Sequence, residues 1–180
     1  MKRILIIGGT GMLRGATDYF ISNNFHVSVV GRNMQKLSYF TKEHPDLKTI
    51  DLINEDYCDT DKFIAAVNRN IEQHGIYDII ISWIHSSATN SLLQLIDLIS
   101  KYNSNTVFYH IKSSQSLDSA KSYDFNSKLV YREIFLGFKI DNNLSRWLTD
   151  SEISEGTIEA VRSNKSKFIV GQIEPKELRP

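Results

Sequence analysis

A glycine-rich stretch near the N-terminus, IIGGTGMLRG at residues 6–15, has the residues to bind a phosphate group through its backbone. Gly8, Gly9 and Gly11 follow an aliphatic run, and the residues after them have apolar side chains at helical spacing. Glycines let the backbone approach a ligand closely, and the first turn of a helix offers unpaired N–H groups and the positive end of its dipole. Such a turn between a buried strand and a helix predicts a pyrophosphate site; a purely structural turn is the alternative.

The elements around this turn alternate between strands and helices. The predicted strands are short apolar or β-branched runs that end at turn residues, at 3–9, 26–32, 47–53, 77–84, 105–111, 130–140 and 167–173. The predicted helices have amphipathic spacing and capping residues, and they cover 15–24, 34–44, 59–75, 90–102 and 150–164. A polar segment at 112–128 separates the fifth and sixth strands.

This alternation predicts an α/β protein with a three-layer α/β/α Rossmann fold and a doubly wound parallel sheet of about seven strands. Right-handed crossovers place helices on both faces of such a sheet. We expect one dinucleotide-binding domain at residues 1–174, followed by a surface tail at 175–180.

Composition excludes several kinds of partner. Hydrophobic residues make up 41% and charged residues 23% of the 180 residues, and the formal net charge is zero. Nucleic-acid binding needs a basic face, which this balance does not indicate. No apolar run is long enough to span a membrane, and the N-terminal ILII is too short for a signal peptide, so we expect a cytoplasmic protein. The one cysteine, Cys58, is interpreted as a small packing residue.

The spacing of the glycine-rich turn, Gly8-x-x-Gly11-x-x-Arg14-Gly15, resembles the G-x-x-G-x-x-G turn of extended and atypical short-chain dehydrogenases/reductases. The order of elements agrees with that family over most of the chain. Residues 146–164 look like the helix that follows its sixth strand, and residues 167–174 look like its last strand.

The resemblance implies a bound nicotinamide dinucleotide. In the turn, its expected contacts are Gly8, Thr10, Gly11, Met12 and Leu13. Arg14 stands where the family has its third glycine, with Gly15 one position later. Three interpretations of Arg14 remain open: it shifts the helix, it binds a phosphate, or it is an exposed helix arginine.

The end of the second predicted strand indicates which cofactor binds. NAD-binding domains place Asp or Glu there for the ribose hydroxyls, whereas this strand ends in Gly31-Arg32-Asn33. A guanidinium matches the geometry of a 2′-phosphate, and family members that use NADP often look like this. We therefore expect NADP(H) rather than NAD(H), with Arg32 and Asn33 at its adenosine end. A solvated loop arginine is the alternative.

The resemblance assigns two further segments to the cofactor. Residues 54–59, NEDYCD, resemble the acidic turn that holds adenine in the family, which makes Asp56 and Tyr57 candidates; Asp56 equally suits the start of a helix. The segment Ser82-Trp83-Ile84 takes the place of the family's Asn-Ala-Gly under the cofactor ribose. Trp83 as a core residue is the alternative.

The catalytic residues of the family are incomplete in this chain. The family uses a Ser after the fifth strand and a Tyr-x-x-x-Lys pair for proton transfer. Ser113 or Ser114 stands at the serine position. Tyr123 and Lys128 are five residues apart instead of four and are interpreted as a surface loop, and Tyr131 is expected to pack in a strand.

Two histidines lie at the predicted carboxyl ends of neighbouring central strands, where ligands bind in open α/β sheets. His85 is a candidate general acid/base, whereas His110 lies within an apolar run and is interpreted as a core histidine. The catalytic candidates are therefore His85, Ser113 and Ser114. No cluster of carboxylates and histidines in the sequence indicates a metal site.

These residues support two functions. The first is an NADP(H)-dependent oxidoreductase acting on a small carbonyl or alcohol substrate. The second is a non-catalytic NADP(H)-binding sensor or regulator, favoured by the missing Tyr-x-x-x-Lys pair. An open pocket lined by His85 and Ser113 would favour the first. Family dimers commonly use the helices after strands four and five; the second of these is not predicted here, so a homodimer is left open.

Overall fold

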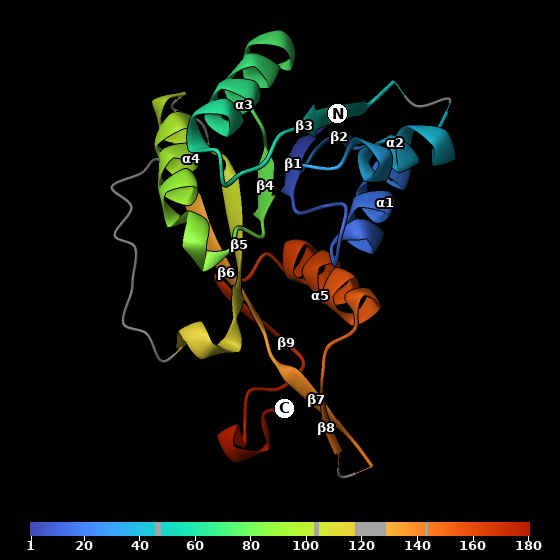
Figure 1. Ribbon diagram of the computed structural model, residues 1–180, viewed down its shortest axis with the longest axis vertical. Coiled ribbons are helices and arrows are strands. Elements are labelled where there is room, and N and C mark those ends of the chain that lie inside the picture. The colour runs from blue at the N-terminus through green and yellow to red at the C-terminus, as the bar shows by residue number, and fades with distance from the viewer. Residues whose placement is uncertain (46–47, 103–104, 118–128, 143) are drawn as a thin grey trace.

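The computed structural model describes residues 1–45, 48–102, 105–117, 129–142 and 144–180. Seven strands form one parallel sheet in the order β3-β2-β1-β4-β5-β6-β9 (Figure 1). Their bounds are β1 Arg3–Ile7, β2 His26–Gly31, β3 Ile50–Asn54, β4 Ile79–Ser82, β5 Val107–Ser113, β6 Val130–Leu136 and β9 Lys167–Val170. The prediction of a doubly wound parallel sheet is therefore confirmed.

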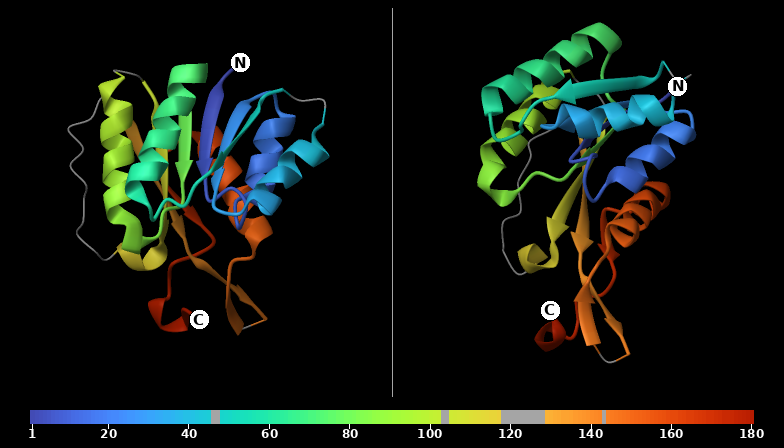
Figure 2. Two further views of the ribbon diagram at one scale, coloured as in Figure 1. Left: turned by 45° about the horizontal axis from the view of Figure 1, so that its top comes forward. Right: turned by 45° about the vertical axis from the view of Figure 1, so that its right-hand side comes forward.

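In the described part of the chain, five helices cover the two faces of this sheet. Their bounds are α1 Arg14–Ser22, α2 Met34–Glu43, α3 Thr60–His74, α4 Thr89–Lys101 and α5 Asp150–Ser163. Helices α1, α2 and α5 share one hydrophobic core with the sheet, and α3 and α4 share another on the opposite face (Figure 2). All five residues of β1 are buried because both cores meet on it.

Local signals in the sequence account for where several helices begin. The Asn33 side chain accepts a hydrogen bond from the Lys36 N–H and caps α2. Asp59 caps α3 in the same way through Lys62 N–H. Thr149 and Glu152 form a reciprocal capping box at α5. These are the side chains that satisfy the unpaired N–H groups of a first helical turn.

The prediction of one continuous strand at 130–140 is wrong. Strand β6 ends at Leu136, and the chain continues as an antiparallel hairpin of β7 (Phe138–Asp141) and β8 (Leu144–Trp147), which projects beyond the sheet (Figure 1). The break lies at Gly137, where a Cβ would collide with the Gln172 backbone. Phe138 and Gln172 exchange backbone hydrogen bonds of 2.9 Å in both directions beside it.

Other boundaries differ less from the predictions. Lys112 and Ser113, expected in a polar segment, complete β5, and a 3-10 turn follows at Ser114–Leu117. Residues 175–180 include a 3-10 turn at Lys176–Leu178. Cys58 is exposed, which corrects its interpretation as a packing residue. Within the described ranges, no helix has both the length and the apolar composition to cross a membrane.

Candidate functional site

The glycine-rich turn connects β1 to α1 at the carboxyl edge of the sheet. Gly8 has a positive φ of 85°, a conformation that side chains other than glycine rarely adopt. The Gly11 N–H donates to the Gly8 carbonyl at 3.3 Å, and the Arg14 N–H donates to the Gly11 carbonyl at 2.9 Å. Helix α5 supports the turn from the side, because the Ser154 hydroxyl donates to the Met12 carbonyl at 2.8 Å.

Two features of this turn fit a pyrophosphate. First, Leu13 precedes α1, and no side chain in the described part of the chain caps the N–H groups of the first turn there. An uncapped helix start can bind an anion through these donors. Second, a Cβ on Gly11 would meet only the Gly8 carbonyl oxygen, at 3.9 Å, so packing does not require glycine here. A ligand lying against the backbone would require it.

A pocket of about 450 Å³ opens over the turn. Nine residues predicted to bind the cofactor line it: Gly8, Thr10, Gly11, Met12, Arg32, Asn33, Asp56, Tyr57 and Trp83. They come from four separate segments, which the parallel sheet brings together at the carboxyl ends of β1, β2, β3 and β4. We call this the dinucleotide pocket.

Charged side chains are concentrated at one end of the dinucleotide pocket. An Arg32 guanidinium nitrogen lies 3.6 Å from an Asp56 carboxylate oxygen, and the Arg32 side chain is 78% exposed. The pKa of Asp56 lies below its ordinary value, first because its carboxylate accepts a hydrogen bond from the Cys58 N–H and also because Arg32 is near. Lys36 lines the same pocket from the first turn of α2 and was not predicted.

Three of the predicted cofactor residues lie elsewhere. The side chains of Leu13 and Ser82 are fully buried and do not line the dinucleotide pocket. The Ser82 hydroxyl has no hydrogen-bond partner among the described residues. Ile84 lies on the wall of a second pocket. Arg14 contacts the Tyr39 ring, with its guanidinium carbon 3.5 Å from the ring centre, and does not line the dinucleotide pocket.

The second pocket, of about 530 Å³, lies at the ends of β4 and β5, and we call it the substrate-side pocket. Trp83 lines both pockets and therefore lies where they meet. His85 and Ser113 line the substrate-side pocket, as do Lys112, Gln115 and Ser116. Ser114 does not: it is fully buried, and its hydroxyl has no hydrogen-bond partner in the described part of the chain.

The two polar groups expected to do chemistry are exposed in this pocket. The His85 Nδ1 lies 3.2 Å from the Ser87 hydroxyl, which orients the imidazole. The Ser113 hydroxyl accepts a hydrogen bond from the Gln115 N–H at 3.3 Å. Among the described residues no acceptor takes its own proton, which can bond a ligand oxygen.

A set of mostly buried polar side chains also contributes to the wall of the substrate-side pocket, which His110 and Lys112 line. His110 Nδ1 is 2.5 Å from the Tyr131 hydroxyl, and Lys112 Nζ is 2.6 Å from a Glu133 carboxylate oxygen. Burial, aided by the charge of Lys112, lowers the pKa of His110 to about 3, so its imidazole is neutral near pH 7. His110 is buried, as expected, and Tyr131 lies in β6. Tyr123 and Lys128 lie outside the described residues.

Comparison with known proteins identifies the fold. No family model and no curated protein matches the sequence. A solved short-chain dehydrogenase/reductase from Brucella melitensis, titled as a glucose/ribitol dehydrogenase, superposes with a TM-score of 0.74 at 13% identity, covering 94% of each chain. A short-chain dehydrogenase from Bacillus anthracis gives a TM-score of 0.71 at 15% identity, covering 96% of each chain.

A third similar structure contains a cofactor. The short-chain dehydrogenase/reductase from Burkholderia phymatum, solved in complex with NAD, gives a TM-score of 0.70 at 8% identity over 94% of this chain and 88% of the other. At these identities the likeness establishes the fold. The chain therefore has a Rossmann fold similar to that of these short-chain dehydrogenases/reductases.

Proposed function

We propose that the protein is an NADP(H)-dependent oxidoreductase acting on a small carbonyl or alcohol substrate. One observation carries the proposal: the dinucleotide pocket over an uncapped glycine-rich turn meets, at Trp83, a second pocket lined by exposed proton-carrying groups. A bound dinucleotide that spans both pockets would place its nicotinamide beside those groups.

Different segments would hold different parts of the cofactor. The glycine-rich turn and the uncapped start of α1 would bind the pyrophosphate through backbone N–H groups. Arg32 and Lys36 supply positive charge for a 2′-phosphate, and Asp56 and Tyr57 lie beside the adenine position. Binding a 2′-phosphate would draw Arg32 away from Asp56, which is a small cost because the exposed pair is weak.

The substrate-side pocket supplies proton transfer and orientation. A nicotinamide bound there supplies or accepts a hydride. His85 would exchange a proton with the substrate oxygen, since an exposed imidazole can do so near neutral pH. Ser113 would donate a hydrogen bond to the same oxygen. Among the described residues the pocket is open and has these two side chains, which favours catalysis over a purely sensing role.

The first test is calorimetric titration with NADPH and with NADH. We expect micromolar binding of NADPH, weaker binding of NADH, and at least a tenfold loss of NADPH affinity in Arg32→Ala, which is about 1.4 kcal/mol. Arg69→Ala is the matched control, because Arg69 is an exposed arginine on α3 that lines neither pocket. Binding of neither dinucleotide would overturn the proposal.

The second test examines catalysis. A panel of small aldehydes and ketones is screened for NADPH oxidation by loss of absorbance. For any substrate found, we expect His85→Ala to lower kcat by about 10²-fold or more, the usual contribution of a general acid/base. The Kd for NADPH should not change. Turnover that survives His85→Ala unchanged would remove His85 from the mechanism.

A further inference from the structure

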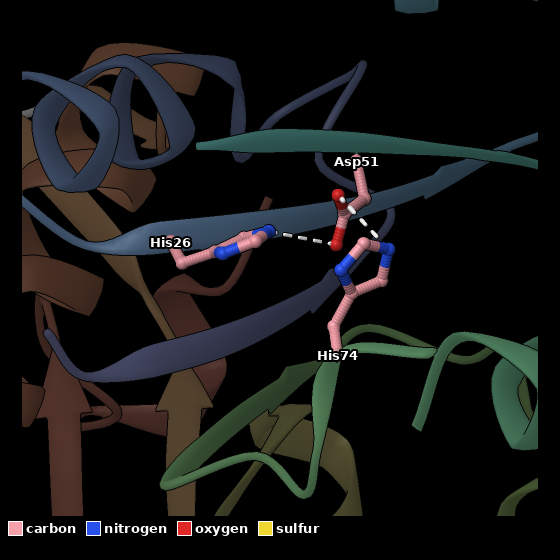
Figure 3. A group of neighbouring side chains, drawn as sticks. All are labelled: His26, Asp51 and His74. Atoms are coloured by element: carbon pink, nitrogen blue, oxygen red, sulfur yellow. Dashed lines mark hydrogen bonds and ion pairs between the residues drawn. The ribbon is translucent and has the colours of Figure 1, made fainter. Parts of the chain in front are cut away.

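Two histidines and an aspartate meet at the amino end of the sheet, the edge opposite the two pockets (Figure 3). His26 is the first residue of β2, Asp51 lies in β3, and His74 is the last residue of α3. One ligand atom from each lies within 4.8 Å of the other two. This cluster was not predicted from the sequence, because its members are more than twenty residues apart in the chain.

The atoms that face one another are metal-ligand atoms. His26 Nε2 lies 2.9 Å from Asp51 Oδ2, and His74 Nε2 lies 3.8 Å from Asp51 Oδ1. Zinc binds imidazole nitrogen and carboxylate oxygen at about 2.0–2.2 Å, so tetrahedral ligands are about 3.3 Å apart. His26 lies closer than this value to Oδ2, and His74 lies farther than this value from Oδ1. His74 is the most exposed of the three, and its ring can turn to complete the site.

The carboxylate is held in place by its other neighbours, as ligating carboxylates usually are. Asp51 Oδ2 accepts hydrogen bonds from the Ser28 hydroxyl at 2.9 Å and the Asn70 amide at 3.1 Å. These two hydrogen bonds fix the orientation of the carboxylate.

One cation and one helix end lie beside the cluster. Arg3 is the nearest positive side chain, and its guanidinium contacts Asp51 Oδ2 at 3.3 Å, whereas His74 faces Oδ1. His26 faces Oδ2, the oxygen that Arg3 also contacts, so its imidazole must turn toward Oδ1 for all three ligands to reach an ion on the side away from Arg3. The carboxyl end of α3, which includes His74, adds the negative end of a helix dipole.

We infer that His26, Asp51 and His74 bind a zinc ion, with water as the fourth ligand. Three protein ligands and a water make up the tetrahedral set that zinc accepts. The ion would join β2, β3 and the end of α3, so it would stabilise the folded chain. The inference is independent of the proposed oxidoreductase function, because none of these residues lines either pocket.

Calorimetry with zinc chloride on chelator-treated protein at neutral pH tests the site directly. We expect one zinc ion per chain with micromolar or tighter affinity. His74→Ala and His26→Ala should each weaken binding at least tenfold. His44→Ala is the matched control, since His44 also faces a carboxylate, Asp18 at 3.4 Å, but lies outside the cluster. Zinc binding should be the same in this control as in the wild type.

A second measurement separates ligand loss from misfolding. Zinc chloride should raise the Tm of the wild type and of His44→Ala, because an ion that binds only the folded state stabilises it. It should not raise the Tm of His74→Ala, whose exposed side chain can be removed without disturbing the core. Absence of zinc binding to the wild type, or equal affinity in His74→Ala, would overturn the inference.

Discussion

Gly11 is the residue at which the demands of folding and of binding can be separated. Its position has room for a methyl group, since the nearest atom to a Cβ there would be the Gly8 carbonyl oxygen at 3.9 Å. The residue nevertheless lines the dinucleotide pocket, where the proposed function brings the backbone close to a pyrophosphate. A methyl group at this position would therefore weaken ligand binding without destabilising the fold.

We predict that Gly11→Ala weakens NADPH binding at least tenfold. The free energy of unfolding should stay within about 0.5 kcal/mol of the wild-type value, as for surface substitutions that break no contact. Calorimetry measures the first quantity and urea denaturation the second. If affinity is unchanged, the ligand does not approach this part of the turn.

At the scale of elements, the β7–β8 hairpin and α5 link the far end of the sheet to the glycine-rich turn. Gly137 lets β6 pass against the Gln172 backbone before the chain enters the hairpin. Helix α5 follows the hairpin, contacts α1, and donates the Ser154 hydrogen bond to Met12 in the turn. A change at Gly137 can therefore affect the pocket through α5.

We predict that Gly137→Ala destabilises the protein by about 2 to 4 kcal/mol, because the new Cβ must displace backbone rather than a flexible side chain. Urea denaturation compared with Gly11→Ala, the same substitution at an open position, measures the effect. Equal stability of the two variants would show that the backbone at Gln172 can move to accommodate the new Cβ at little energetic cost.

The strands and helices could be predicted because their signals are local. Aliphatic runs such as Ile4–Ile7 and capping residues such as Asn33 are visible within a few positions of each other. The hairpin was not predicted because the strand breaks at Gly137 through a contact with Gln172. That residue is 35 positions later in the chain and is brought beside Gly137 only by the fold. An apolar run with one internal glycine looks like a single strand.

Most of the dinucleotide pocket could be predicted because a parallel sheet brings the ends of its strands to one edge. Lys36 was missed because a lysine on the first turn of a helix looks like a solvated charge. Ser113 and Ser114 could not be distinguished, since only the structure shows that one faces the substrate-side pocket and the other is buried. The His26–Asp51–His74 cluster depends on contacts between three separate elements.

At the scale of the whole molecule, His110 makes stability depend on pH. Its pKa falls from an ordinary 6.5 to about 3 on folding, chiefly because burial disfavours the charged imidazole. In acid the unfolded chain therefore binds a proton that the folded chain does not. The contribution to stability is complete above pH 6.5 and is lost as the pH falls toward about 3.

We predict that His110→Gln makes the free energy of unfolding depend less on pH below pH 6.5. At pH 4.5, two units below the ordinary pKa, the wild type should have lost about 2 to 3 kcal/mol through His110 alone, and the variant should not. Urea denaturation at a series of pH values measures this. The control is His85→Gln, at an exposed histidine, which should keep the wild-type slope.

The position of Trp83 gives the protein an intrinsic optical reporter. The chain has two tryptophans: Trp83 lies where the two pockets meet, and Trp147 lies on the hairpin beyond the sheet. Reduced nicotinamide absorbs light in the range where indole emits, so a dinucleotide spanning the pockets would quench Trp83 fluorescence by energy transfer. With Trp147 replaced by phenylalanine, the remaining emission comes from Trp83 and reports on the region where the two pockets meet.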